Sequence, residues 1–99
     1  MNKTPKDQDP QDGFDLIEYP CEFNVKALCR AAEAMPAIDY LRAIIEPLIA
    51  ASDLLSMSTN SSRTGKFESV TALIRLQNRE QLEMIYKTIS SADRVVMTL

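Results

Sequence analysis

The sequence predicts an α+β protein, a two-layer β-α-β-β-α-β sandwich in which two helices cover one face of an antiparallel sheet. Three observations in the last third of the chain carry this prediction. Residues 67–76 alternate and are rich in strand-forming residues, residues 78–90 carry a helical apolar stripe, and residues 93–99 alternate again. A weaker strand and helix and a short strand at residues 54–58 precede them, so the chain contains the six elements of a two-layer domain.

The first strand and helix are predicted from residues 21–49. Residues 21–29 alternate, with five apolar side chains on one face: Cys21, Phe23, Val25, Ala27 and Cys29. Pro36 suits a first helical position, and an apolar stripe at helical spacing follows it: Ile38, Leu41, Ile45, Leu48 and Ile49. Because Pro47 removes a backbone hydrogen bond and clashes with the preceding turn, we expect a kink or break near Glu46.

The second half is predicted from residues 54–99. Residues 54–58 form a short strand, and the polar loop 59–66 joins it to the strand 67–76 in a hairpin. Asn78 is a good N-cap, and Gln81 three residues later completes a capping box. The helix after it carries an apolar stripe that we assign to the core: Leu82, Ile85, Tyr86 and Ile89.

Charge and composition divide the chain into a tail and one domain. Residues 1–13 are polar and contain two prolines and a glycine, so we expect a disordered acidic tail before a single domain at 14–99. Residues 1–22 have a net charge of −4, and residues 23–99 have +1. A nucleic-acid binder normally concentrates basic charge, so we expect no nucleic-acid partner.

The residue types present disfavour an enzyme. The chain has no histidine, which removes the commonest zinc ligand and general base, so we predict no catalytic residues, no metal site and no cofactor. Cys21 and Cys29 would lie ~26 Å apart on one extended strand, so we expect both to be reduced. No apolar run reaches the ~20 residues of a membrane span, and the N-terminus lacks a signal-peptide core. We therefore expect a cytoplasmic protein without a membrane partner.

The sequence disfavours three familiar kinds of site: a phosphate-binding loop, an RNA-binding sheet face and an acid–base pair of carboxylates. The loop 61–66 lacks the first glycine and the final hydroxyl residue of a phosphate-binding loop and leads into a strand, which favours a solvated hairpin tip. Arg63 and Lys66 remain candidate contacts for an anion. An RNA-recognition motif would need stacking aromatics on its central strands, where only Phe67 qualifies. The carboxylates considered for acid–base chemistry are assigned to the solvated surface: Glu68, Glu80, Glu83 and Asp93.

The sheet face that the helices leave open is the main candidate site. We expect it to carry a mixture of polar and apolar residues: Asn24, Lys26, Ser69, Thr71, Arg75, Arg94 and Thr98, with Leu73 and Val96. This mixture suits a protein partner or self-association, and a plain solvated face is an equally good account. The candidate interaction residues are Lys26, Ser69, Thr71, Arg75 and Arg94, of which Lys26 and Arg75 are favoured.

Three groups of residues match the patterns of a known family. Two serines, a basic residue, a glycine, an aromatic residue and Ser-Val occur at Ser61, Ser62, Arg63, Gly65, Phe67, Ser69 and Val70. The closing residues approach Val-x-Met-x-Leu at Val95, Met97 and Leu99, and an aromatic-Pro, Phe-x-x-Lys opening occurs at Tyr19, Pro20, Phe23 and Lys26. On these residues the chain resembles the YbeD-like family of small bacterial proteins of unknown function.

The resemblance implies a ferredoxin-like sandwich akin to regulatory ACT domains, which bind small metabolites beside metabolic enzymes. Cys29 stands where the family usually has a glycine, and Thr64 lengthens the hairpin loop. Two hypotheses follow. The chain is a non-enzymatic regulatory module that binds a protein or itself through the open sheet face or a strand edge. Alternatively, it is an ACT-like sensor that holds a small metabolite between the first strand's end and the first helix.

Overall fold

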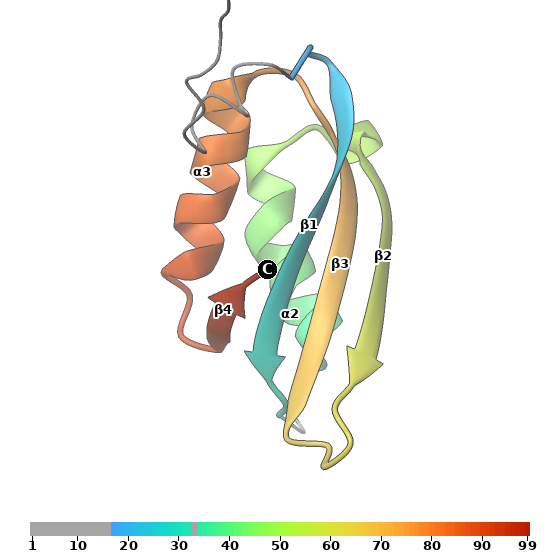
Figure 1. The fold of residues 1–99 in the computed structure, drawn as a ribbon, viewed down its shortest axis with the longest axis vertical. Helices are drawn as coiled ribbons and strands as arrows, with labels where there is room; N and C mark the ends of the chain where they lie inside the picture. The colour runs from blue at the N-terminus through green and yellow to red at the C-terminus, as the bar shows by residue number, and fades with distance from the viewer. Residues whose placement is uncertain (1–16, 33) are drawn as a thin grey trace, which may run out of the picture.

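The computed structural model describes residues 17–32 and 34–99, and the predicted tail at 1–13 lies outside them. Four strands form one antiparallel sheet in the order β2-β3-β1-β4 (Figure 1). The strands are β1 (Cys21–Arg30), β2 (Leu54–Ser61), β3 (Phe67–Leu76) and β4 (Val95–Thr98). The helices α2 (Ala37–Ile45) and α3 (Arg79–Ser90) pack on one face of the sheet, which confirms the predicted two-layer sandwich.

The helix α2 ends where the sequence predicts a break. Its last residue is Ile45, and a 3-10 turn over Glu46–Leu48 follows, with Pro47 in its first turn. A second 3-10 turn, Ala51–Asp53, leads into β2. Pro36 does not occupy the first helical position, since its ψ of 146° is extended, and it serves as the N-cap.

Two strand boundaries differ from the prediction. The strand β2 continues to Ser61, because Thr59, Asn60 and Ser61 pair residue by residue with β3. Polar side chains such as these are typical of a loop, but the backbone of β3 supplies the hydrogen bonds that hold the three residues in a strand. The strand β4 starts at Val95, because Val95 N–H donates to Ala92 O at 3.1 Å and closes a turn before it.

The helix α3 is capped by Asn78, whose Oδ1 accepts from Gln81 N–H at 2.8 Å. The return bond of the predicted capping box is shifted by one residue. Gln81 Oε1 accepts from the N–H of Gln77 at 2.8 Å, and the cap residue itself does not donate to it. The start of α3 is thus tied directly to the end of β3.

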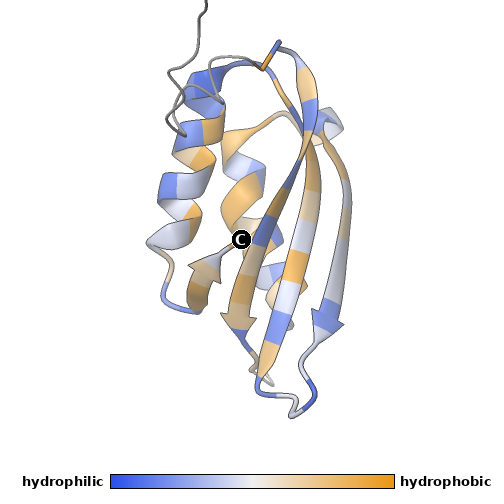
Figure 2. Ribbon diagram, in the orientation of Figure 1, coloured by the Kyte–Doolittle hydropathy of each residue, from blue (hydrophilic) through white to orange (hydrophobic). Residues whose placement is uncertain are grey.

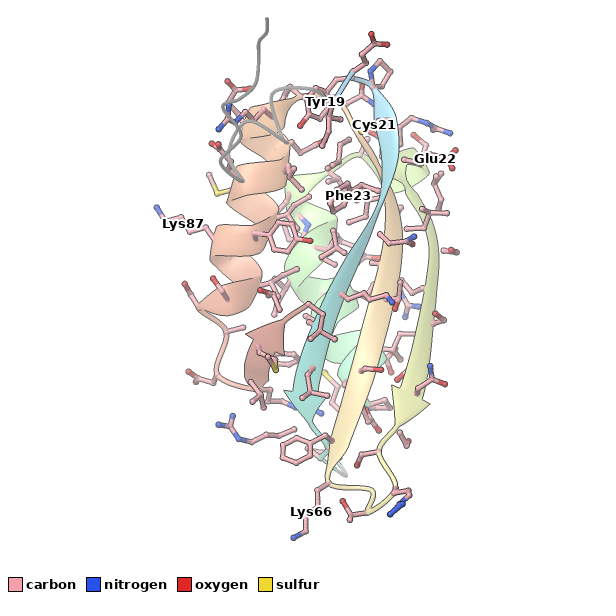
Figure 3. All side chains as sticks on the ribbon, in the orientation of Figure 1. Tyr19, Cys21, Glu22, Phe23, Lys66 and Lys87 are labelled. Atoms are coloured by element: carbon pink, nitrogen blue, oxygen red, sulfur yellow. The ribbon has the colours of Figure 1, made fainter. Side chains whose placement is uncertain are left out.

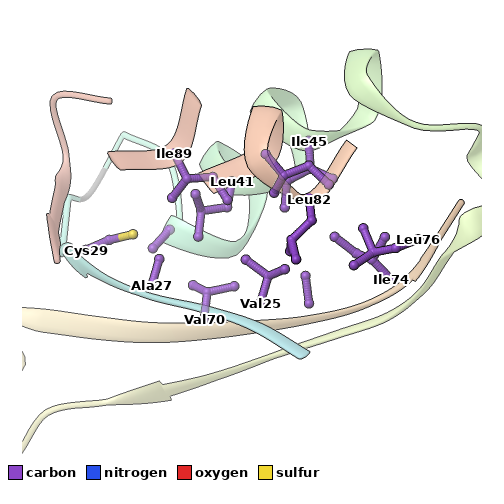
Figure 4. Close-up of a cluster of buried hydrophobic side chains, with 13 residues drawn as sticks. Val25, Ala27, Cys29, Leu41, Ile45, Val70, Ile74, Leu76, Leu82 and Ile89 are labelled. Atoms are coloured by element: carbon purple, nitrogen blue, oxygen red, sulfur yellow. The ribbon is translucent and has the colours of Figure 1, made fainter. Parts of the chain in front are cut away.

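The core lies between the sheet and the two helices (Figure 4). Alternate residues of β1 and β3 contribute its floor, and the predicted stripe on α3 is buried at Leu82, Ile85 and Ile89. Tyr86 is half-buried, and its ring meets Phe23 edge to face, with centroids 6.4 Å apart and planes at 89°. The regular alternation explains why one sheet face is covered and the other is open.

Candidate functional site

The open face of the sheet follows from the register of its strands. Val25, Ala27 and Cys29 of β1 are buried beneath the helices, as are their partners Ala72 and Val70 in β3. Side chains alternate along a strand, so the residues between them project to the opposite side. We call this side the open face, and its central residues are Asn24, Lys26, Leu28, Phe67, Ser69, Thr71, Leu73 and Arg75. The banding of β1 and β3 in Figure 2 shows the same alternation.

Three of the candidate interaction residues lie together near the middle of the open face. Lys26 and Thr71 are directly opposite each other on β1 and β3, and Ser69 lies two residues along from Thr71. Lys26 is exposed, while both hydroxyl residues are half-buried. These three residues form a polar strip with one cation, which can offer hydrogen bonds to a partner.

Arg75 also lies on the open face but has a partner in the molecule. Its Nη1 is 3.6 Å from Oδ1 of Asp53, the residue just before β2. The other carboxylate oxygen of Asp53 accepts from Gln77 Nε2 at 3.1 Å. Since Asp53 is only 7% exposed, this pair ties the start of β2 to the end of β3.

An apolar patch lies beside the polar strip. Leu28 of β1 is directly opposite Met97 of β4, and Met97 is 51% exposed. Phe67, 36% exposed, is the diagonal neighbour of Leu28 across the β1–β3 pair. We call Leu28, Phe67 and Met97 the apolar patch.

Of the predicted apolar residues, only Leu73 is in the open-face register. The sequence favoured Val96, but a bulge between the pairs Cys29–Val95 and Leu28–Met97 leaves Val96 without a direct partner. The bulge therefore gives Met97 the position that simple alternation would predict for its neighbour. No sequence pattern within β4 reveals this one-residue shift.

Two predicted open-face residues lie elsewhere. Arg94 is in the turn before β4, where its Nε and Nη2 donate to Arg30 O at 3.0 and 2.8 Å and its Nη1 donates to Met35 O at 2.8 Å. Its guanidinium also lies 4.9 Å from the ring centroid of Tyr40. Thr98 pairs with the buried Ala27 and therefore lies on the helix side. The prediction for Arg94 was wrong because β4 starts at Val95, and the prediction for Thr98 was wrong because the bulge reverses the alternation after Val96.

The turn from β1 to α2, where the resemblance implied a metabolite site, is held by side chains of the chain itself. The Arg94 guanidinium donates hydrogen bonds to the carbonyl groups of Arg30 and Met35, and Glu68 Oε1 accepts one from Ala37 N–H at 2.8 Å. Glu68 is therefore a helix cap, which corrects its assignment to the solvated surface. No pocket is found at this turn or elsewhere among residues 17–32 and 34–99.

Cys29 lies on the buried side of the same turn. Its side chain is fully buried, and this burial raises the pKa of the thiol, although the nearby Arg94 charge acts in the opposite direction. Cys21 and Cys29 are both free cysteines. A buried thiol with a raised pKa is a poor nucleophile, so the geometry gives Cys29 a packing role.

The candidate anion contacts lie at the hairpin tip, beyond the end of the polar strip. Ser62 holds this loop, since its hydroxyl accepts from Phe67 N–H at 3.1 Å and its own N–H donates to Phe67 O at 2.8 Å. Gly65 has a φ of 77°, a conformation that favours glycine. Arg63 and Lys66 are exposed on either side of Gly65. The Lys66 side chain extends outward from the hairpin end of the molecule (Figure 3).

Within residues 17–32 and 34–99, no group of three or more His, Cys, Asp and Glu residues could hold a metal ion. No helix in this part of the chain is long and apolar enough to cross a membrane.

Comparison with known sequences gives one consistent result. The sequence model of a family described as "Protein of unknown function (DUF493)" matches residues 15–99. The UPF0250 protein PA3998 of Pseudomonas aeruginosa is 31% identical over 100 residues and covers the full length of both chains. The UPF0250 protein NE1487 of Nitrosomonas europaea is 29% identical over 84 residues, which span 85% of this chain and 94% of the relative.

A solved structure has the same fold. The solution structure of protein HP0495 from H. pylori has a TM-score of 0.65 and covers 100% of this chain and 98% of its own. Its sequence identity is 22%, so the likeness supports the arrangement of strands and helices and nothing about the site.

Proposed function

We propose that this chain, which belongs to the DUF493 family of proteins of unknown function, is a non-enzymatic regulatory module of the cytoplasm. In this proposal it binds a partner protein through the open face. The observation that carries the proposal is the apolar patch beside the polar strip, on the side of the sheet that neither helix covers.

The composition of the open face suits a protein partner. Leu28, Phe67 and Met97 would supply apolar area at the centre of an interface, and Thr71 and Ser69 would supply hydrogen bonds around it. Lys26 adds one positive charge, which favours a partner with a carboxylate at the matching position. Aromatic and methionine side chains are enriched in protein interfaces, whereas lysine is depleted, so the patch and not Lys26 should supply most of the affinity.

The metabolite-sensor alternative has less support from the geometry. A ligand at the β1–α2 turn would need the carbonyl groups of Arg30 and Met35 or the N–H of Ala37, and all three already have intramolecular partners. Opening the turn would break these bonds before a ligand could replace them. We therefore place this hypothesis second.

Paired methionine substitutions test the proposal. Met84 on α3 and Met97 on β4 are each 51% exposed, so Met84→Lys matches Met97→Lys in exposure and chemistry. Each tagged variant would be used to capture proteins from a bacterial extract, and a captured protein would then be purified for direct binding measurements. We expect a partner that binds the unsubstituted chain and Met84→Lys but loses about tenfold or more affinity for Met97→Lys.

Unchanged binding by variants of the open face would contradict the proposal. If Met97→Lys and Lys26→Glu bind every purified partner as tightly as the unsubstituted chain, the open face is not the binding surface. Thermal unfolding of each variant controls for loss of the fold, since both methionines are at exposed positions where a lysine is tolerated.

A further inference from the structure

We propose that the free edge of β2 pairs in antiparallel fashion with the β2 of a second copy, so that two four-stranded sheets join into one. The strand β2 lies at the end of the sheet and pairs with β3 on one side. Its eight residues, Leu54–Ser61, include no charged residue and no proline. This inference concerns a strand edge and is independent of the partner proposed for the open face.

The backbone of β2 offers a regular row of hydrogen-bonding groups at this edge. Ser62 N–H donates to Phe67 O at 2.8 Å, which shows that Ser62 directs its backbone toward β3. Backbone groups alternate in direction along a strand, so Ser58 and Asn60 also bond toward β3. The N–H and C=O groups of Met57, Thr59 and Ser61 therefore point to the free edge.

The other end of the sheet differs in a way that discourages pairing. The strand β4 has four residues, and the bulge opposite Leu28 and Cys29 interrupts its register. Short edge strands and bulges are features that protect a sheet from adding further strands, as are charged residues and prolines. The edge of β2 is twice as long and lacks charges and prolines, although its own register shift lies at its first residues, Leu54 to Ser56.

A second copy is the occupant that best fits this edge. An antiparallel copy related by a two-fold axis presents the same donors and acceptors in reverse order, so each edge satisfies the other. The strand itself carries no charge that would repel its own copy. Antiparallel pairing also keeps the exposed cations Arg63 and Lys66 of the two copies at opposite ends of the joined strands.

The side chains along the edge are compatible with self-pairing. Near the strand centre they are Met57, Ser58, Thr59 and Asn60, and both copies can pair them without placing like charges opposite each other. Thr59 is the middle one of the three residues whose backbone groups point to the free edge, and it is exposed. It is therefore the residue at which a substitution should matter most.

Sedimentation of the full chain over a range of concentrations tests the proposal. We expect a reversible dimer, and Thr59→Pro should raise its dissociation constant by about tenfold or more, because two symmetry-related edge N–H donors are lost. Ala50→Pro is a matched control, because Ala50 is exposed, lies outside β2 and has a φ of −69° that proline accepts. It should leave the dimer unchanged.

A second variant controls for the possibility that Thr59→Pro disrupts the strand β2 and not only its pairing with a second copy. Thr59→Lys keeps the backbone donor but places a like charge on both copies at the centre of the pairing, so it should also weaken the dimer. A chain that stays monomeric at millimolar concentration would overturn the proposal, as would a dimer unaffected by both Thr59 variants. A dimer that Met97→Lys dissociates and the Thr59 variants do not would show pairing through the open face instead.

Discussion

Glu68 and Ala37 join the sheet to the first helix. The Oε1 of Glu68, in β3, accepts a hydrogen bond from the N–H of Ala37 at 2.8 Å across 31 residues of sequence. The cap residue of α2 is Pro36, which has no side-chain acceptor, so a carboxylate from the neighbouring strand satisfies this N–H. Its negative charge also interacts favourably with the helix dipole.

Replacing Glu68 should therefore weaken the fold. Glu68→Ala should lower the free energy of unfolding by about 1 kcal/mol, within the ~0.5–2 kcal/mol range of lost helix caps. Glu68→Gln retains an oxygen acceptor without the charge and should lose less. Urea unfolding of the three chains at neutral pH measures both differences, and equal stability of all three would contradict the capping role.

Arg94 should not be replaceable by lysine. Its guanidinium donates to two carbonyl groups in a fixed fork and covers the ring of Tyr40, and a lysine ammonium cannot reproduce this geometry. We expect Arg94→Lys to lose about 1–3 kcal/mol of unfolding free energy. Arg63→Lys, at the exposed hairpin tip, should change it by less than about 0.5 kcal/mol. Similar thermal unfolding of the two variants would argue against the role of Arg94 as a clamp.

Alkaline pH should destabilise the protein through Cys29. Burial raises the pKa of this thiol in the folded chain, so the folded state retains a proton that the unfolded chain releases above about pH 8.5. The stability gained in this way is fully present below that pH and is lost as the pH rises through the folded-state pKa. Burial also raises the pKa of Tyr86, which adds a loss of the same sign above about pH 10.

Cys29→Ala separates these two contributions. The variant lacks the thiol, so its unfolding free energy should stay flat from about pH 8 to 10, whereas that of the unsubstituted chain falls. Because the smaller side chain also leaves a cavity, the slopes against pH are compared and not the absolute stabilities. Parallel urea-unfolding curves for both chains across this range would contradict the assignment.

The fold was predictable where a local pattern decides the structure. The stripe of Leu82, Ile85 and Ile89 identifies α3, and its buried face agrees with the spacing of apolar residues. Pro47 likewise marks the end of α2, because the loss of a backbone donor does not depend on distant residues. The end of β2 was missed because Thr59–Ser61 are held in a strand by pairing with β3, which no local pattern records.

The candidate site was predictable only in part. Alternation places Lys26, Ser69 and Thr71 on one side of the sheet, as expected. Arg94 and Glu68 were misplaced because their partners, Met35 O and Ala37 N–H, are 59 and 31 residues away in sequence. Such contacts depend on how the helices sit on the sheet, and composition alone contains no signal for them.

Asp53 should be more sensitive to substitution than its partner Arg75. Asp53 is 7% exposed and its carboxylate bonds to Gln77 and pairs with Arg75, so Asp53→Ala removes both interactions and should cost about 1–3 kcal/mol of unfolding free energy. The Arg75 side chain is 41% exposed, and solvent screens its ion pair, so Arg75→Ala should cost less than about 1 kcal/mol.

A double-mutant cycle, measured by urea unfolding, separates the Asp53–Arg75 pair from the Asp53–Gln77 bond. The Asp53–Arg75 coupling should be a minor part of the Asp53→Ala loss, since that carboxylate keeps its second partner when Arg75 is removed. A coupling energy equal to the full loss would instead show that the ion pair alone fixes the start of β2. Arg75 would then have a structural role, and its substitution would no longer be an informative test of partner binding at the open face.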